Sequence, residues 1–200
     1  NLYAIPFGIL RIAKPLGCIA KISRNMNNEL LFERLFIDSE LADIICSEFG
    51  ITRKELSLYA KETTKERNEE ITEIKRVRSL YHNKKNLVGF EFKSFNAFYK
   101  WHKYQHIKQK GKCHYCKTDE HIISKLFETK YGNRKRLNRG LHLEVERRDS
   151  DTNIYDDDNC VLACYFCNND KSDIFTESEF LKYLKNRNQF FKEEFKKLND

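Results

Sequence analysis

The chain has 200 residues, of which 40% are hydrophobic and 34% are charged, and its formal net charge is +7. This length allows one large domain or two small ones with a packed core, and the basic balance indicates a polyanionic partner. No apolar run reaches about 18 residues, so no membrane span is expected. The seven cysteines, with no convincing signal peptide at the start, are typical of a reducing cytoplasm.

The first 85 residues are expected to form an N-terminal helical region. Residues 1–25 are apolar but broken by glycine and proline, which indicates short extended pieces or a docking arm. Residues 38–62 have the pattern of two helices: Ser39 is a candidate cap for the first, Gly50 ends it and Thr52 caps the second. This pattern is that of a helix-turn-helix, in which Arg53, Lys54 and Ser57 would reach DNA. A helical hairpin that packs on the core explains it slightly better.

The segment 61–78 is densely charged and predicts a solvated linking helix. Residues 86–107 are rich in aromatic side chains, which take a helical spacing from Phe95 onward and are therefore expected in the core. Only Trp101 or Tyr104 is a candidate for stacking on a base, and a core position is favoured for both. His102 and His106, one helical turn apart, are interpreted as surface or phosphate-contacting residues.

Charge is segregated along the chain. From Lys103 to Arg148 there are thirteen Lys and Arg against five Asp and Glu, whereas from Asp149 to Asp173 seven Asp face Lys171 alone. A glycine-flanked loop within the basic block predicts contacts with backbone phosphates, although a basic run is often only a solvated face. The expected DNA contacts are Lys130, Arg134, Lys135, Arg136, Arg139, Arg148 and Lys171.

Two C-x-x-C pairs enclose the most informative part of the chain. Each pair places two thiolates on a tight turn, and Zn²⁺ in structural sites takes four such ligands. The alternative is a pair of disulfides or four buried thiols, which the spacing makes less favoured. The sequence therefore predicts one structural zinc ion bound by Cys113, Cys116, Cys164 and Cys167.

The stretch 113–175 resembles the HNH endonucleases, which cut DNA with one divalent ion on a ββα-metal fold. The matching features are the strand 143–146, the central Asn159, and Cys167-Asn168 followed by Lys171. The resemblance implies an α+β, mostly helical chain whose residues 86–200 hold a zinc-stapled nuclease domain. It also implies that Glu146 and Asn168 bind Mg²⁺ or Mn²⁺, while Asn159 stiffens the loop.

The middle of the pattern departs from the family at Arg147. This residue stands where the family has its general-base His, and a guanidinium stays protonated, so it can bind a phosphate but cannot accept a proton. Asp149 is a candidate second ligand for the cation. The base remains open: His142 lies on the opposite strand face, and Tyr155, another segment or metal-bound hydroxide are the other candidates.

Two functions follow from these features. The favoured one is a metal-dependent deoxyribonuclease acting on double-stranded DNA, related to restriction or phage enzymes in its pattern. The alternative is a zinc-stapled DNA-binding protein that keeps the fold without cutting. The C-terminal segment 176–200 has an apolar helical stripe, typical of a helix that packs on the core or forms a homodimer.

Overall fold

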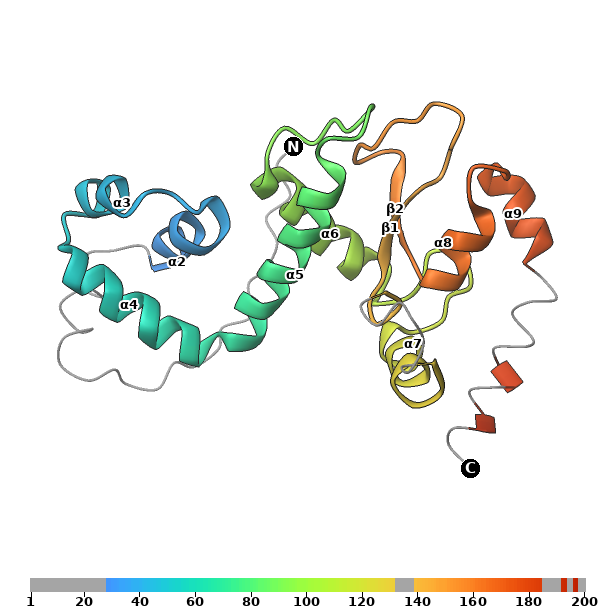
Figure 1. Cartoon of the computed structure of the whole chain (residues 1–200), viewed down its shortest axis with the longest axis horizontal. Coiled ribbons are helices and arrows are strands. Elements are labelled where there is room, and N and C mark those ends of the chain that lie inside the picture. Colours follow the sequence, from blue (N-terminus) through green and yellow to red (C-terminus); the bar gives the residue numbers. More distant parts are fainter. Residues whose placement is uncertain (1–27, 132–138, 185–191, 194–195, 198–200) are drawn as a thin grey trace. The chain divides into compact units, whose positions relative to one another are not determined.

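The computed structural model describes residues 28–131, 139–184, 192–193 and 196–197, without the side chains of 130 and 131. The described part is mostly helical with one small sheet, so the α+β prediction holds at that level (Figure 1). Several predicted features lie outside it, namely the arm at 1–25, the side chain of Lys130, the basic residues Arg134, Lys135 and Arg136, and most of the C-terminal stripe.

The chain forms two compact units, Asn1–Thr72 and Glu73–Asp200. The division between them falls within the helix α5, which contributes residues to both units, whereas the sequence analysis ended the N-terminal region at residue 85. The described elements of the first unit are α2 (Asn28–Phe32), η1 (Glu33–Asp38), α3 (Ala42–Phe49), α4 (Arg53–Glu66) and the start of α5 (Asn68–Lys84). Those of the second are the rest of α5, α6 (Phe95–Lys108), α7 (Glu120–Leu126), η2 (Phe127–Tyr131), β1 (Glu144–Arg147), β2 (Cys160–Ala163), α8 (Tyr165–Lys171) and α9 (Glu177–Tyr183).

The first unit contains the helix pair that the sequence predicted. Gly50 ends α3 in the left-handed conformation, at φ 63°, and Thr52 begins α4 with a capping box that it shares with Glu55. Ser39 does not cap α3; it ends the π-helix η1, also in the left-handed region. The core that fixes this unit consists of Leu31, Ile45, Leu56 and Tyr59. Within this pair Arg53 is bound to Asp43 at 2.6 Å.

The aromatic helix α6 lies in the core of the second unit. Its rings Phe95, Phe98, Tyr99 and Trp101 are buried, as predicted, whereas Tyr104, for which a core position was favoured, is 55% exposed. The expectation for His102 was wrong, because its side chain is buried rather than on the surface. Burial lowers the pKa of His102 to about 4, so this imidazole is neutral at pH 7. A base-stacking role for Trp101 is disfavoured because this side chain is also buried.

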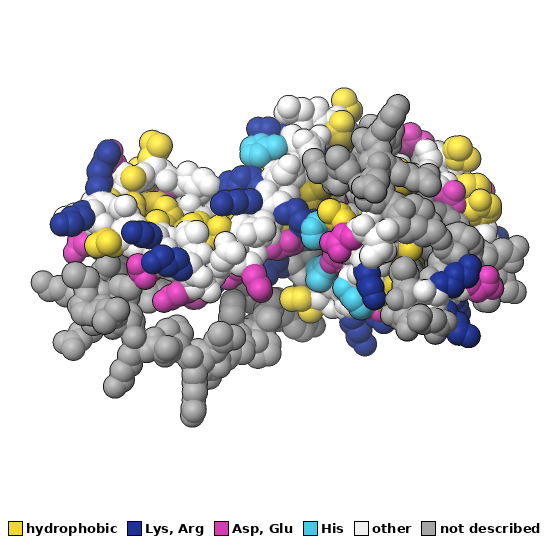
Figure 2. Space-filling model, turned by 60° about the horizontal axis from the view of Figure 1, so that its bottom comes forward, with side chains coloured by type: hydrophobic (Ala, Val, Ile, Leu, Met, Phe, Trp, Pro, Cys, Tyr) yellow, Lys and Arg dark blue, Asp and Glu magenta, His cyan; other side chains and the backbone are white. Residues whose placement is uncertain are grey.

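The second predicted histidine of α6, His106, pairs with a carboxylate. Its Nε2 lies 2.8 Å from Glu120, which also accepts a hydrogen bond from the backbone amide of Leu143 at 2.8 Å. Burial raises the pKa of Glu120, but these hydrogen bonds outweigh it and lower the pKa below its usual range. Figure 2 shows His side chains next to acidic side chains on the face that it presents. Glu120 thus ties α6 and α7 to the start of the hairpin.

The sheet is an antiparallel hairpin of β1 and β2, with Val145 opposite Leu162. The outer edge of β2 is completed by a side chain. Gln109, just after α6, donates to the carbonyls of Leu162 and Lys112, each at 2.7 Å, and accepts from the Leu162 amide at 3.0 Å. Its amide therefore stands in for a third strand and attaches α6 to the hairpin. Among the described helices, none is long and apolar enough to cross a membrane.

Replacing Gln109 by Leu is expected to lower the free energy of unfolding of the second unit by about 2–4 kcal/mol, because the buried Leu162 amide loses its partner. Asn83→Leu, at an exposed position of α5, is the control and is expected to change it by less than about 0.5 kcal/mol. Urea denaturation of both variants measures the difference, and equal stabilities would contradict the role assigned to Gln109.

Candidate metal centre and active site

The first cysteine pair lies on a tight turn between α6 and α7. The Cys113 amide donates to the Thr118 carbonyl at 2.9 Å and the Lys117 amide to the Cys113 carbonyl at 3.1 Å. Lys117 takes the left-handed conformation, at φ 59°, which closes the turn. Cys113 and Cys116 consequently aim their sulfur atoms to the same side of the turn, and the Cys113 side chain is fully buried.

The second pair begins helix α8. Cys164 is the N-cap, and its sulfur accepts from the Cys167 amide at 3.4 Å. The Cys164 amide in turn donates to the sulfur of Cys113, 3.2 Å away and 51 residues earlier in the chain. Amide donors of this kind stabilise thiolate charge, and they orient the sulfur atoms from outside the cluster.

The four sulfur atoms form a group whose members all lie within 4.8 Å of one another. A zinc ion with ligands at about 2.3 Å requires sulfur atoms about 3.8 Å apart along each edge of the tetrahedron. The Sγ atoms of Cys116 and Cys164 are 3.8 Å apart. Hydrogen bonds from Cys113, Cys164 and Cys167 lower the pKa of Cys116. The four cysteines are thus close enough to bind a metal such as zinc. None of the four forms a disulfide.

A cluster of charged side chains lies between β1 and α8. Glu146 is only 8% exposed, and its Oε1 lies 3.4 Å from the Nζ of Lys171, which is fully buried. Lys171 also donates to the hydroxyl of Ser150 at 2.8 Å. Burial raises the pKa of Glu146 to about 7, against the attraction of Lys171, Lys84 and Arg147. Glu146 is therefore close to the balance between its charged and neutral forms near neutral pH.

Asn168 meets a different carboxylate from the one that the sequence analysis paired with it. Its Nδ2 donates to Oε2 of Glu144 at 2.6 Å. Glu144 and Glu146 are two residues apart on one face of β1, and Asn168 and Lys171 are three apart on one face of α8, so the two faces meet. Arg139 also binds Glu144, at 3.0 Å from its Nε. The alternation of β1 carried the signal for Glu144, which sequence reasoning did not use.

Arg147 is held by protein groups. Its guanidinium binds Asp173 at 2.9 Å, donates to Asn153 and packs 4.8 Å from the centre of the Tyr155 ring. The Arg147 side chain is 11% exposed. A phosphate reaches this guanidinium only by displacing Asp173 or by using its remaining donors.

Lys84 is a member of this cluster that no sequence pattern indicated. It comes from the end of α5, and its Nζ lies 4.8 Å from the centre of the same Tyr155 ring. Burial lowers the pKa of Lys84. In the sequence, Lys84 stands in an ordinary basic run, and only the tertiary fold brings it to Tyr155.

The loop between β1 and β2 is organised by Asn159. Its side chain donates to the carbonyls of Asp149 and Ile154, at 2.9 and 2.8 Å, and accepts from the Asp149 amide at 2.8 Å. The Asp149 carboxylate accepts from the Asp151 amide at 2.9 Å and is exposed. The structure therefore places Asp149 in the turn, where its polar partners are Asn159 and Asp151 and, among the described residues, not Glu146 or Asn168.

The same loop depends on one glycine. Gly89 has φ 82°, and a Cβ there would lie 2.0 Å from the carbonyl oxygen of Asn153. This close approach lets the Tyr155 amide donate to the Gly89 carbonyl at 2.7 Å. The backbone before α6 thus holds the loop that carries Asn153 and Tyr155, the two residues that contact Arg147.

Of the other predicted DNA contacts, Arg148 binds Glu177 at 2.7 Å and remains half exposed. Glu177 also lies 2.6 Å from Nε2 of His114, so the first cysteine turn, the end of β1 and α9 share this carboxylate. His142 is exposed, and its carboxylate partner is Glu120, with 3.3 Å between Nδ1 and Oε1. Comparisons with protein-family models, with curated proteins and with solved structures find no match to this chain.

Changing Cys116 to Ser is expected to abolish stoichiometric metal in the purified protein and to unfold the second unit, because three sulfur ligands bind a structural metal far more weakly than four. Metal analysis and thermal melting measure both effects. Cys46→Ser is the matched control, since Cys46 belongs to the core of the first unit. Full metal content in the Cys116 variant would contradict the assignment of this ligand.

The raised pKa of Glu146 predicts a pH-dependent stability. A carboxyl whose folded pKa of about 7 exceeds its unfolded value stabilises the fold at low pH, and this contribution is lost as the pH rises through about 7. Glu146→Gln removes the titration. The unfolding free energy of the variant relative to wild type is therefore expected to increase from about pH 5 to about pH 8, by at most about 3 kcal/mol. A pH-independent difference would show that Glu146 titrates normally.

Proposed function

We propose that this chain is a metal-dependent endonuclease that hydrolyses DNA phosphodiester bonds at the meeting of β1 and α8, resembling the HNH enzymes. The observation that supports the proposal best is the pairing of two strand carboxylates, Glu144 and Glu146, with Asn168 and Lys171 on α8. The helix that carries the latter two begins at the four-cysteine cluster. A hairpin and a helix joined in this way are the parts that the sequence resemblance implies.

The residues divide into ligands and charge carriers. Glu146 and Asn168 offer oxygen donors, which suit a hard cation such as Mg²⁺ or Mn²⁺. Such a cation supplies Lewis-acid stabilisation of the charge on the phosphate. Lys171 competes with this cation, because its ammonium already contacts one oxygen of Glu146. Glu144, bound by Asn168, is the residue that sets the orientation of that amide.

Three cations surround Glu146 and would face a bound phosphate. Lys171 contacts Glu146 directly, whereas Lys84 and Arg147 lie against the Tyr155 ring and lower the pKa of Glu146 through space. Positive groups placed in advance around a phosphate stabilise the charge that develops during its hydrolysis. Arg147 cannot act as the base, so its role in this proposal is to bind the scissile or an adjacent phosphate.

In this proposal the four cysteines hold one structural Zn²⁺, and the protein acts on double-stranded DNA in a reducing compartment. The zinc ion fixes the start of α8, so the structural metal determines where Asn168 and Lys171 lie.

A second candidate is a zinc-stapled DNA-binding protein that does not cut. The observation in its favour is that Arg147 and Glu146 are both neutralised by protein groups, Asp173 and Lys171. Such pairing stabilises a fold without any catalytic requirement. The two candidates differ in a single measurable property, the nicking of DNA.

We expect supercoiled plasmid to be nicked by the zinc-loaded protein in the presence of Mg²⁺ or Mn²⁺. Glu146→Gln and Asn168→Ala are each expected to reduce the rate about a hundredfold or more, since both remove an oxygen donor to the cation. Glu66→Gln, at an exposed position of α4, is the control and is expected to cut normally. Gel electrophoresis of the time course gives the rates.

Arg147 separates the two candidates further. If its guanidinium binds the phosphate, Arg147→Ala and Arg147→His both lower the cutting rate. If it only fills a disused base position, His creates or raises activity. Wild-type protein that binds DNA yet never nicks it with Mg²⁺, Mn²⁺, Co²⁺ or Ni²⁺ would reject the enzyme and leave the binding protein.

A further inference from the structure

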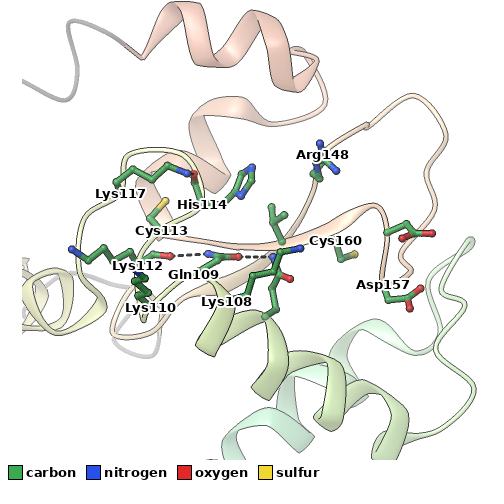
Figure 3. A pocket seen from close by; sticks show the side chains of 13 residues that line it. Lys108, Gln109, Lys110, Lys112, Cys113, His114, Lys117, Arg148, Asp157 and Cys160 are labelled. Carbon is green, nitrogen blue, oxygen red and sulfur yellow. Dashed lines mark hydrogen bonds between the residues drawn. The ribbon is translucent and has the colours of Figure 1, made fainter. Parts of the chain in front are cut away.

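A groove of about 610 Å³ runs beside the first cysteine turn (Figure 3), and Glu146 and Lys171 are not among the described residues that line it. Five of its lining residues are cationic and two are acidic. Four of the cations come from one short segment, 108–117, and the fifth is at the end of β1. The cationic residues are Lys108, Lys110, Lys112, Lys117 and Arg148.

Most of these cations remain available to an outside partner. Lys112 and Arg148 have carboxylate partners, Asp119 at 3.5 Å and Glu177 at 2.7 Å. Within the part of the chain that the structure describes, Lys108, Lys110 and Lys117 have no carboxylate partner, and all three are exposed. Lys117 donates to the carbonyl of His114, and the Nζ of Lys108 lies 5.8 Å from the centre of the Tyr104 ring. Like charges gathered on one concave surface raise the local potential and attract a polyanion.

The groove is built on fixed backbone. Lys110 and Gly111 both have left-handed conformations, at φ 56° and 65°, which turn the chain sharply after α6. Gln109 fastens this turn to β2 through Leu162. Its bonds to Lys112 and Gln105 are drawn in Figure 3. Cys113 attaches the other end of the segment to the sulfur cluster. The lysines therefore project from a support that needs no ordering when a ligand binds.

The composition of the lining selects the kind of polyanion. Among the described residues that line the groove there is no Phe, Tyr or Trp, whereas proteins that hold single strands use such rings to stack on bases. Four of the five cations are lysines, and Lys side chains commonly contact the backbone phosphates of a duplex. Asp157 and Asp158 line the groove as well, and their charge repels phosphates from their part of it. The bound backbone is thereby confined to the side of the lysines.

From these features we infer that the groove binds the backbone phosphates of one strand of double-stranded DNA, as a contact surface separate from the candidate active site. The inference rests on the proposed function, since it names DNA as the partner. The sequence analysis predicted phosphate contacts for the basic loop within residues 125–139. The groove is a different surface, formed by residues 108–117 together with Arg148.

The test is the binding of a labelled duplex of about 30 base pairs to the zinc-loaded protein, without Mg²⁺ or Mn²⁺, at salt concentrations from about 50 to 200 mM. A triple variant with Lys108, Lys110 and Lys117 changed to Ala is expected to bind at least about tenfold more weakly and to reduce the salt slope by about 2 to 3. The control triple variant changes the exposed Lys61, Lys65 and Lys75 to Ala, and it is expected to keep the wild-type slope.

A variant of opposite sign excludes misfolding as the cause. Asp157→Asn with Asp158→Asn removes two exposed negative charges and is expected to tighten duplex binding by about threefold to tenfold. An unchanged slope in the lysine variant, an equal loss in the control, or no tightening with the Asn pair would overturn the inference. So would equal binding of single-stranded DNA. Nicking is measured separately: loss of binding in a protein that never cuts supports the groove and rejects the enzyme, and normal binding in a lysine variant that cuts rejects the groove alone.

Discussion

The sulfur cluster is the constraint on which the rest of the second unit depends. It brings the sulfur atoms of Cys116 and Cys164 together across 48 residues. Closing this loop costs conformational entropy, which the binding of a metal would offset. Cys164 ends β2 and begins α8 at the same point. The position of the sulfur atoms therefore sets the register of the hairpin against the helix, and with it the meeting of Glu144 with Asn168 and of Glu146 with Lys171.

The charges of the two strand carboxylates, Glu144 and Glu146, are each balanced by a cation, as their burial requires. A buried carboxylate without a partner is costly, and each strand carboxylate here has a cation, Arg139 for Glu144 and Lys171 for Glu146. Under the proposed function, a divalent cation at Glu146 would compete with Lys171 and with a proton. Its affinity would then depend on whether the ammonium can leave Glu146 for Ser150, to which it is already bound at 2.8 Å.

Local chemistry was predictable from the sequence, and long-range pairing was not. The paired cysteines, the Gly50 stop, the Thr52 cap and the burial of the aromatic helix all depend on a few neighbouring residues. The contacts of Gln109 with Leu162, of Lys84 with Tyr155 and of Arg147 with Asp173 join residues 26 to 71 positions apart, which no periodic pattern records. The prediction that Ser39 caps α3 was wrong for a related reason, because the preceding segment forms a π-helix that ends at this residue.

The segregation of charge along the sequence acquires a different meaning in the folded chain. Several acidic side chains of the segment 149–173 accept hydrogen bonds within their own loop: Asp149 binds the amide of Asp151 and Asp156 that of Asn159, while Asp173 binds Arg147. Asp149 and Asp156 stabilise turns and Asp173 pairs with Arg147, so none of these contacts neutralises a lysine of the segment 108–117. The lysines after α6 therefore keep their charge directed outward, and the two remaining acids that line the groove, Asp157 and Asp158, limit it instead of cancelling it. A basic block beside an acidic block in the sequence thus becomes a positive surface with a defined negative boundary.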